Sequence, residues 1–263
     1  MDLKNKLALI TGASVGIGAE FSKQLAAQGC NLILVARSAD ALNRLADNLR
    51  TTFNIDVTVL TQDLSQPGAG ETIYNAVVER GLKVDILINN AGIGMYGEFL
   101  QQSLVQIHSM LRLNIDTLTD LTHLFLPAMK GRGEGIIILV GSIASFMPGP
   151  LYAAYSASKA YVLSLGEALN RELKGSGVSC TVVCPGVTAT SFFDVAGQND
   201  RYTLYQKLVI MKPEDVASIG LRAALQGKHS VLTGFLNKLQ AFVLRFTPRA
   251  LATFMAYRGM KLN

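Results

Sequence analysis

Short, uninterrupted apolar runs recur along the first 190 residues and alternate with segments of helical spacing. Apolar runs of about 4–8 residues are typical of parallel strands that are buried on both faces. We therefore expect strands near residues 7–10, 31–36, 56–60, 84–89, 135–141 and 178–184, and a last strand near 230–233. This alternation predicts an α/β fold with a doubly wound parallel sheet.

A glycine-rich loop, TGASVGIG at residues 11–18, follows the first predicted strand, and a helical pattern at 19–28 leads from it to Gly29, a suitable C-cap. A glycine turn at a helix N-terminus offers backbone N–H groups and a positive dipole end, and it lets the backbone approach a pyrophosphate closely. An ordinary tight turn is the alternative, but the strand–loop–helix order favours a dinucleotide site in a single Rossmann-type domain. The candidate cofactor contacts here are Gly12, Ser14, Gly16, Ile17 and Gly18.

Tyr155 and Lys159 are four residues apart in a segment with a helical pattern, so both side chains belong to one helical face. A phenol has an ordinary pKa of about 10, and a neighbouring ammonium favours the phenolate. The spacing therefore predicts a lowered pKa for Tyr155 and a group that exchanges a proton with an oxygen near neutral pH. Taken alone, such a pair is usually a surface tyrosine beside a surface lysine.

Five separated motifs resemble the short-chain dehydrogenase/reductase family in order and in spacing. They are TGxxxGxG at 11–18, NNAG at 89–92, Ser142, YxxxK at 155–159 and Pro-Gly at 185–186. The resemblance extends from about Lys6 to about Thr190, and it leaves the last part of the chain without a motif. It implies an oxidoreductase that uses a nicotinamide cofactor.

The resemblance also implies roles for individual residues. Tyr155 would exchange the proton with the substrate oxygen, and Ser142 would bind and orient that oxygen. Lys159 would lower the pKa of Tyr155 and hold the nicotinamide ribose. Asn114 would support a water relay to the lysine, although an asparagine in an apolar helix segment can also simply kink or satisfy that helix. Further implied cofactor contacts are Asp63, Leu64, Asn90, Ala91, Gly92, Pro185, Gly186, Val187 and Thr188.

The end of the second predicted strand indicates which dinucleotide is bound. An NAD site of this architecture usually has an acidic residue there, which binds the ribose 2′-hydroxyl. This chain has Arg37 and Ser38, and its first acid is Asp40. A guanidinium suits a 2′-phosphate, so we expect NADP(H), with Arg37 and Ser38 as contacts. The departure is Val15, because many NADP-preferring relatives have a basic residue at that position in the loop.

The residues expected to line the substrate pocket are mostly apolar or aromatic, and none of them is a lysine or arginine. This composition favours a lipophilic carbonyl or alcohol, and the segment 190–212 is the expected lid. The set consists of Gly94, Met95, Tyr96, Ala144, Phe146, Met147, Pro148, Tyr152, Phe192 and Phe193.

Charge is distributed unevenly along the chain. Residues 1–215 contain 17 of the 24 Lys and Arg and all 19 acids, whereas residues 216–263 contain seven cations and no acid. We therefore divide the chain into a dinucleotide-binding and catalytic domain, 1–233, and a basic amphipathic helical extension, 234–263, with a helix break at 247–249. The extension can lie on an anionic membrane surface, or it can pack on the substrate entrance or on a partner subunit.

Other features narrow the class of protein. Three cysteines without nearby histidines or acids give neither a disulfide framework nor a metal site, so we expect no metal. The first residues lack the pattern of a signal peptide, and no long apolar stretch is present, which favours a cytoplasmic location, with or without peripheral membrane contact. No nucleic-acid reader motif accompanies the cations. By resemblance, we expect a homodimer or homotetramer.

The sequence therefore predicts an NADP(H)-dependent oxidoreductase that interconverts a carbonyl and a secondary alcohol on a lipophilic substrate. Two alternatives remain. One is a ketoacyl-thioester reductase of lipid metabolism, and the other is a non-catalytic NADP-binding protein associated with membranes.

Overall fold

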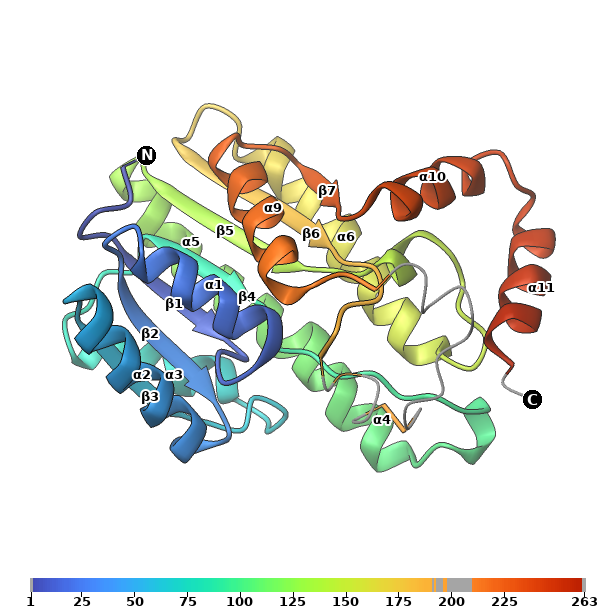
Figure 1. Cartoon of the computed structure of the whole chain (residues 1–263), viewed down its shortest axis with the longest axis horizontal. Coiled ribbons are helices and arrows are strands. Elements are labelled where there is room, and N and C mark those ends of the chain that lie inside the picture. Colours follow the sequence, from blue (N-terminus) through green and yellow to red (C-terminus); the bar gives the residue numbers. More distant parts are fainter. Residues whose placement is uncertain (1, 191, 193–195, 198–209, 262–263) are drawn as a thin grey trace.

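The computed structural model describes residues 2–190, 192, 196–197 and 210–261. The chain forms one seven-stranded sheet in the order β3-β2-β1-β4-β5-β6-β7, and every neighbouring pair is parallel (Figure 1). The strands are β1 (Leu7–Thr11), β2 (Asn31–Ala36), β3 (Val57–Thr61), β4 (Ile86–Asn89), β5 (Gly135–Val140), β6 (Val178–Cys184) and β7 (Ser230–Leu232). All seven predicted strands are confirmed to within two residues at each end.

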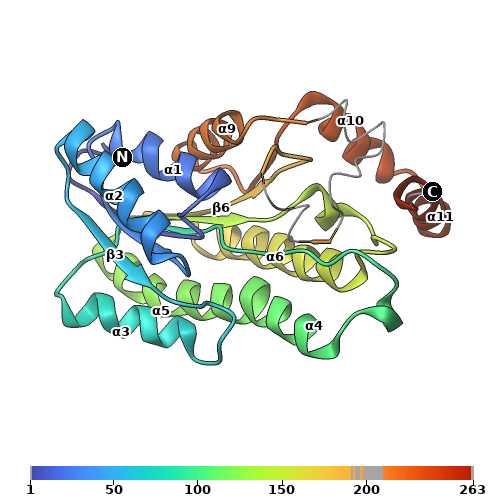
Figure 2. The ribbon, with the colours of Figure 1, turned by 60° about the horizontal axis from the view of Figure 1, so that its bottom comes forward.

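Helices cover both faces of this sheet, as Figure 2 shows. One face carries α1 (Gly16–Ala26), α2 (Ala39–Phe53) and α9 (Pro213–Leu225); the other carries α3 (Ala69–Glu79), α4 (Leu104–Leu111), α5 (Thr117–Arg132) and α6 (Ala153–Glu172).

Each face has its own apolar core. Phe21, Leu25 and Leu42 belong to the core on the α1 side, and Leu121 and Val162 belong to the core on the α6 side. Because β5 is buried on both faces, its apolar run does not alternate with polar residues. The predicted doubly wound Rossmann-type sheet is confirmed.

One helix differs from its predicted bounds, and another region is more divided than a single helix. Helix α1 begins at Gly16, directly inside the glycine loop, and ends at Ala26 rather than at Gln28. Between β4 and β5 the chain forms a 3₁₀ turn, η1 (Phe99–Gln101), then α4, then a π-helical segment, η2 (Arg112–Asp116), and then α5. The π segment contains Asn114, and such bulges are frequent at functional sites.

The C-terminal extension consists of α10 (Phe235–Leu244) and α11 (Arg249–Met260), with the predicted break at Pro248. Both helices lie beyond the carboxyl ends of β5 and β6, away from the body of the sheet (Figure 1). Within the described ranges, no helix has both the length and the apolar character needed to cross a bilayer.

Candidate active site

One cavity of about 900 Å³ lies along the carboxyl edge of the sheet, where a topological switch occurs between β1 and β4. The site residues predicted from the sequence line it, except Gly18 and Asn114. They are Gly12, Ser14, Gly16, Ile17, Arg37, Ser38, Asp63, Leu64, Asn90, Ala91, Gly92, Ser142, Tyr155, Lys159, Pro185, Gly186, Val187 and Thr188.

The glycine loop has the geometry of an anion cradle. Gly12 and Gly16 have backbone φ angles of +64° and +58°, which residues other than glycine rarely adopt. Gly18 does not line the cavity, and its role is packing: a Cβ there would lie 2.2 Å from the carbonyl oxygen of Gly12. Since α1 has no acid in its first turn, its N-terminal N–H groups and dipole are available to a phosphate.

Asn90 and Thr11 fix this loop against β4. The Asn90 side chain donates to the carbonyl oxygens of Thr11 (2.9 Å) and Gly12 (3.2 Å). In return, the Thr11 hydroxyl accepts from the backbone N–H of Asn90 and of Ala91, both at 3.0 Å. Asn89 faces the opposite side, where it donates to Thr122 at 3.0 Å, and so it does not belong to the cavity.

The outer end of the cavity lies between the ends of β2 and β3. Arg37 is exposed at this edge, and Ser38 is the N-cap of α2, where its hydroxyl accepts from Ala41 N–H at 3.4 Å. Partial burial raises the pKa of Asp63, but hydrogen bonds from Ser65 and Gln66 and the charge of Arg37 outweigh it and lower the pKa. The edge therefore combines a free guanidinium with a carboxylate that stays ionised.

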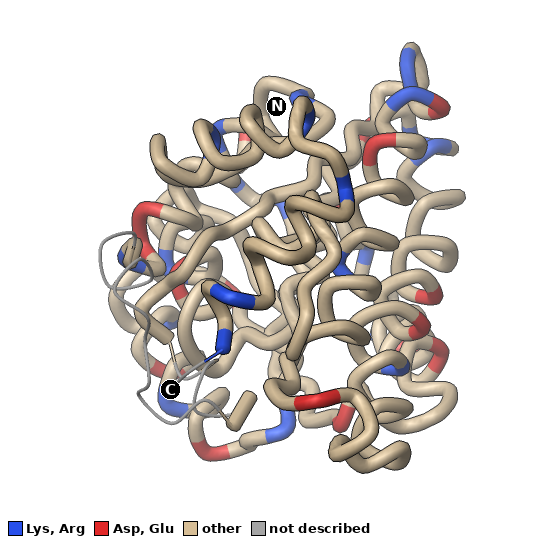
Figure 3. Tube along the Cα trace, turned by 90° about the vertical axis from the view of Figure 1, so that its right-hand side faces the viewer, with Lys and Arg blue, Asp and Glu red and all other residues tan. Residues whose placement is uncertain are grey.

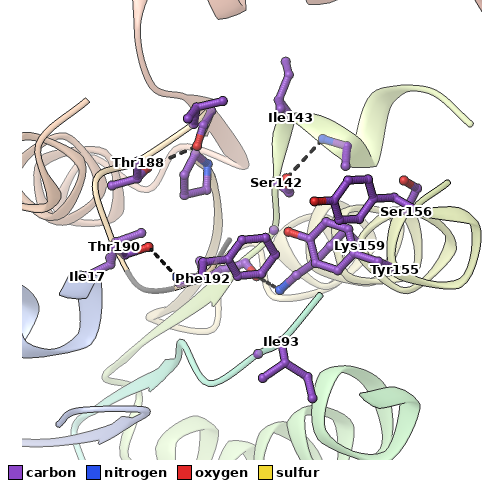
Figure 4. Close-up of a pocket in the computed structure, with 18 of the residues that line it drawn as sticks. Ile17, Ile93, Ser142, Ile143, Tyr155, Ser156, Lys159, Thr188, Thr190 and Phe192 are labelled. Carbon is purple, nitrogen blue, oxygen red and sulfur yellow. Dashed lines mark hydrogen bonds between the residues drawn. The ribbon is translucent and has the colours of Figure 1, made fainter. Parts of the chain in front are cut away.

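Ser142, Tyr155 and Lys159 meet at the inner end (Figure 4). The Ser142 side chain lies near the Tyr155 hydroxyl, where it favours the phenolate. Ser142 is the N-cap of η3 (Ile143–Phe146), and its backbone N–H donates to the Ser145 hydroxyl at 3.2 Å. That hydroxyl donates in turn to the backbone carbonyl of Lys159 at 2.8 Å, so Ser145 fixes the turn after β5 against α6.

Burial sets the protonation of the Tyr–Lys pair. It raises the pKa of Tyr155 to about 12, with the nearby Ser142 side chain acting in the opposite direction. It lowers the pKa of Lys159 to about 8. The lowered tyrosine pKa predicted from the sequence is therefore wrong for the free protein. The reason is that desolvation of the phenolate dominates and the ammonium donates to Val140 O at 2.8 Å.

Asn114 is fully buried behind the cavity. Its amide donates to Ile93 O (3.0 Å) and to the Ser158 hydroxyl (3.1 Å), and its oxygen accepts from Ile93 N–H (3.1 Å). These bonds join the segment after β4 to helix α6, so Asn114 is a positioning residue. The water relay implied by the resemblance stays a prediction.

The substrate end is aromatic. The ring of Tyr155 has its centroid 5.3 Å from that of Phe192 and 5.8 Å from that of Tyr152. Of the predicted pocket residues, Ala144, Met147, Tyr152 and Phe192 line the cavity. Gly94, Met95, Tyr96, Phe146 and Pro148 do not, while Phe193 and most of the expected lid 190–212 lie outside the described residues.

Helices α10 and α11 supply a wall of the cavity that the sequence analysis did not assign to particular residues. This wall includes Leu236, Asn237, Leu239, Gln240, Val243, Leu244, Thr247, Ala252, Met255, Ala256, Gly259 and Met260. Asn237 lies so close to the Pro185–Gly186 turn that a Cβ on Gly186 would be 2.1 Å from its side chain. The only available signal was the helical spacing of apolar residues after Gly234.

These residues fit a dinucleotide. The glycine loop and the N-terminus of α1 suit its pyrophosphate, and Arg37 and Asp63 flank the far end of the same cavity. Gly92 leaves room for the lysine, since a Cβ there would lie 3.1 Å from the Lys159 ammonium.

Comparison with known proteins agrees with this geometry. The model of the short chain dehydrogenase family matches residues 6–201. The chain belongs to this family. Human 17-beta-hydroxysteroid dehydrogenase type 3 is 30% identical over 97% of the chain and 83% of its own length. Mouse very-long-chain 3-oxoacyl-CoA reductase is 28% identical over 92% of the chain and 75% of its own length.

Two solved structures are also similar. One, from work on the stereoselectivity of a 7beta-hydroxysteroid dehydrogenase, has a TM-score of 0.88 and 25% identity, and covers 97% of this chain and 99% of its own. The other is a short-chain dehydrogenase from Sphingobium yanoikuyae in complex with NADPH. Its TM-score is 0.80 and its identity 30%, with 93% of this chain and 97% of its own covered.

Proposed function

We propose that this protein is an NADP(H)-dependent oxidoreductase that interconverts a carbonyl and a secondary alcohol on a lipophilic substrate. The observation that supports it best is that the hydroxyls of Ser142 and Tyr155 lie together beside Lys159, in a cavity that continues to the glycine loop. Two hydroxyl donors at one point can bind the oxygen of a carbonyl or alcohol and exchange a proton with it.

In the reductive direction the cofactor supplies hydride to the carbonyl carbon. Tyr155 donates its proton to the carbonyl oxygen, and its raised pKa keeps that proton in place until the oxygen becomes basic. Ser142 binds the same oxygen and orients it, and a preorganised donor acts most strongly where charge develops. Lys159, mostly charged at neutral pH, holds the ribose hydroxyls and favours the tyrosinate as it forms.

We assign the 2′-phosphate contact to Arg37 and Ser38. Both lie at the end of β2, where the guanidinium is exposed towards the cavity. The complex of a similar dehydrogenase with NADPH supports this choice. The remaining cofactor contacts are the cavity-lining residues of the glycine loop, of 63–64, of 90–92 and of 185–188.

An apolar wall supports a lipophilic substrate. Leu236, Leu239 and Val243 of α10 and Met255 of α11 face the cavity, which has the aromatic rings of Tyr152 and Phe192 near Tyr155. The similarity to a steroid dehydrogenase supports a bulky alicyclic ketone or alcohol. The similarity to a very-long-chain 3-oxoacyl-CoA reductase keeps a ketoacyl thioester as the second candidate.

Two associations accompany this function in our proposal. The first is a homodimer or homotetramer that pairs through α4–α5 and α6, whose outer surface includes Tyr161 and small residues such as Ala160. The second is peripheral contact between a membrane and the extension 234–263, which we treat as distinct from the domain 1–233.

A carbonyl panel tests the function, with NADPH and NADH absorbance as the readout. The panel should contain steroid ketones, long-chain ketones, a ketoacyl thioester and a small water-soluble ketone. Tyr155→Phe should lower turnover at least about 100-fold, because general acid catalysis is lost, and should leave the NADPH Kd within a few-fold. NADPH binding without turnover of any carbonyl would instead favour the non-catalytic alternative.

A further inference from the structure

The two C-terminal helices each have one side towards the cavity and another towards solvent. On α10 the cavity side contains Leu236, Gln240, Val243 and Leu244, and on α11 it contains Ala252, Met255, Ala256 and Gly259. These positions follow helical spacing, so the opposite positions form a second stripe on each helix.

The outer stripes are apolar, aromatic and unusually exposed. Phe235 is 78% exposed, Phe242 59% and Phe246 75% on or just after α10. On α11, Leu251 is 48% exposed and Phe254 55%. Exposed apolar sets of this kind mark sites of interaction with a protein or a membrane.

Cations alternate with these aromatic residues. Lys238, Arg245 and Arg249 are exposed in the α10 stripe and at the start of α11, and Arg258 and Lys261 follow near the end of α11. The Arg258 guanidinium lies 5.2 Å from the centroid of the Phe254 ring. In Figure 3 this side faces the reader, and the tubes of α10 and α11 have blue segments but no red ones, since residues 216–263 contain no acid.

The same helices contact the catalytic end. The Tyr96 hydroxyl donates to the carbonyl oxygen of Met260 at 2.9 Å. Met260 packs in one cluster with Tyr155, Tyr152 and Phe192. The end of α11 therefore packs against the aromatic cluster around the reacting tyrosine.

We infer that α10 and α11 lie flat on an anionic lipid surface, with their outer stripes in the headgroup region, and that the lipophilic substrate moves from that surface between the two helices to Tyr155. The inference rests on the proposed function for its substrate, but not for the docking itself. Aromatic residues with interspersed lysine and arginine are the composition that favours such an interfacial position.

Charge and length distinguish a lipid surface from other partners. In a two-fold interface between copies of this chain the same patch meets itself, so cations without acids would face cations without acids. Helices of 10 and 12 residues are about 15–18 Å long, which is too short to span a bilayer core of about 30 Å. Of the two arrangements in a membrane, lying on its surface is therefore the one that these helices permit.

Vesicle co-sedimentation tests the docking. The full chain should bind vesicles of phosphatidylcholine with about one third phosphatidylglycerol, should bind pure phosphatidylcholine far less, and should dissociate as salt is raised. A wild-type protein that binds neither type of vesicle would overturn the inference.

A triple variant localises the surface. Lys238→Glu, Phe246→Ser and Arg249→Glu alter outer positions that do not line the cavity, and both glutamates would be near helix N-termini, where acids are tolerated. Binding to anionic vesicles should fall at least about tenfold, since reversal of two cations removes favourable charge at the surface. The matched control is Val78→Ser, Arg80→Glu and Lys83→Glu, exposed residues at the end of α3 and beyond.

The substrate route has its own test. The triple variant should oxidise NADPH with a small water-soluble ketone within twofold of the wild type, but at least about tenfold more slowly with a long-chain ketone embedded in anionic vesicles. Equal losses with both ketones would refute the route.

Vesicle binding needs no turnover. A protein that binds vesicles but reduces no ketone therefore disproves the proposed function and leaves the docking intact. Light scattering measures the oligomeric state of the triple variant. If the variant dissociates into monomers but still binds anionic vesicles, a second copy of the chain covers this face, and the inference is wrong.

Discussion

The hydroxyl of Tyr96 donates a 2.9 Å hydrogen bond to the backbone carbonyl of Met260, 164 residues further along the chain. Tyr96 follows β4, and Met260 is the last residue of α11. The Tyr96 ring also lies 5.3 Å, centroid to centroid, from the ring of Tyr152, which is next to Tyr155. This bond therefore attaches the C-terminal extension to the aromatic cluster around the reacting tyrosine.

Tyr96→Phe should loosen that attachment. The change removes one hydrogen bond, worth about 1 kcal/mol, and keeps the ring. We expect the KM for a lipophilic ketone to rise several-fold, the NADPH Kd to stay unchanged, and trypsin to cut faster after Arg249 and Arg258. Tyr161→Phe is the control, because it removes a tyrosine hydroxyl bond to Thr119, remote from the extension. Equal proteolysis of the two variants would argue against this role for Tyr96.

Arg37→Asp should move cofactor preference towards NADH. Arg37 is the cation at the end of β2, and its charge lowers the pKa of Asp63 across the cavity edge. A carboxylate in its place repels a 2′-phosphate and can accept from a ribose hydroxyl. The NADPH Kd should weaken at least about tenfold, with the NADH Kd unchanged or tighter. The control is Arg44→Asp, an exposed reversal on α2 outside the cavity. Unaltered preference would mean that another group holds the phosphate.

Gly18→Ala should damage both folding and cofactor binding. A Cβ at residue 18 would lie 2.2 Å from Gly12 O and 2.5 Å from the Asn90 amide, so the loop and β4 would have to separate. Such overpacking costs about 1–3 kcal/mol. Calorimetry should give a lower Tm and a weaker NADPH Kd. Gly131→Ala, also in a helix but with nothing within 4 Å, should be neutral or slightly stabilising. Equal changes in Tm and in the NADPH Kd for the two variants would contradict this role for Gly18.

The sequence predicts the sheet well because inner strands such as β5 are buried on both faces, and an apolar run is then sufficient to locate them. It also predicts the cavity residues on β1, β2, β4, β5 and β6, since short motifs at strand ends meet at one edge of a parallel sheet. Gly18 and Asn114, also predicted as site residues, do not line the cavity; they lie behind it, where they make close packing and hydrogen bonds.

Two features could not be obtained from the sequence. The sign of the pKa shift of Tyr155 depends on its burial among residues distant in sequence, such as Phe192, and helical spacing with Lys159 does not reveal it. The cavity wall from α10 and α11 depends on where the extension folds back. An amphipathic helix pattern shows that a side is apolar but does not show what it covers.

The two directions of the reaction should respond differently to pH. With a pKa of about 12, Tyr155 is protonated throughout the neutral range, as the reduction requires. Oxidation requires its deprotonated form, so kcat/KM for alcohol oxidation should rise about tenfold per pH unit while kcat/KM for reduction stays level. The range from about pH 6 to 7.5 is suitable, since it lies below the pKa of Lys159. If kcat/KM bends near pH 7 in both directions, the pKa of Tyr155 is lowered, as the sequence predicts, and is not raised.

Lys159→Met should make the free protein more stable at neutral pH and inactive. The folded-state pKa of Lys159, about 8, is below its ordinary value of 10.5, so the unfolded chain binds this proton more tightly. The contribution of Lys159 to the free energy of unfolding is therefore largest above pH 10.5, where the amine is neutral in both states. It is lost as pH falls through 8, where the buried amine becomes charged. The difference corresponds to about 3 kcal/mol, of which loss of the hydrogen bond to Val140 offsets about 1 kcal/mol.

Urea unfolding at two pH values measures this effect. The Lys159→Met variant should be more stable than the wild type by about 2 kcal/mol near pH 7. Above pH 10.5 the wild-type amine is neutral in both states, so the variant should instead be less stable by the lost hydrogen bond, about 1 kcal/mol. Lys174→Met, at an exposed lysine after α6, should give no gap at either pH. If the variant is still more stable than the wild type at high pH, poor packing of the lysine side chain, and not its buried charge, destabilises the wild-type protein. The lowered pKa of Lys159 would then not explain the difference in stability.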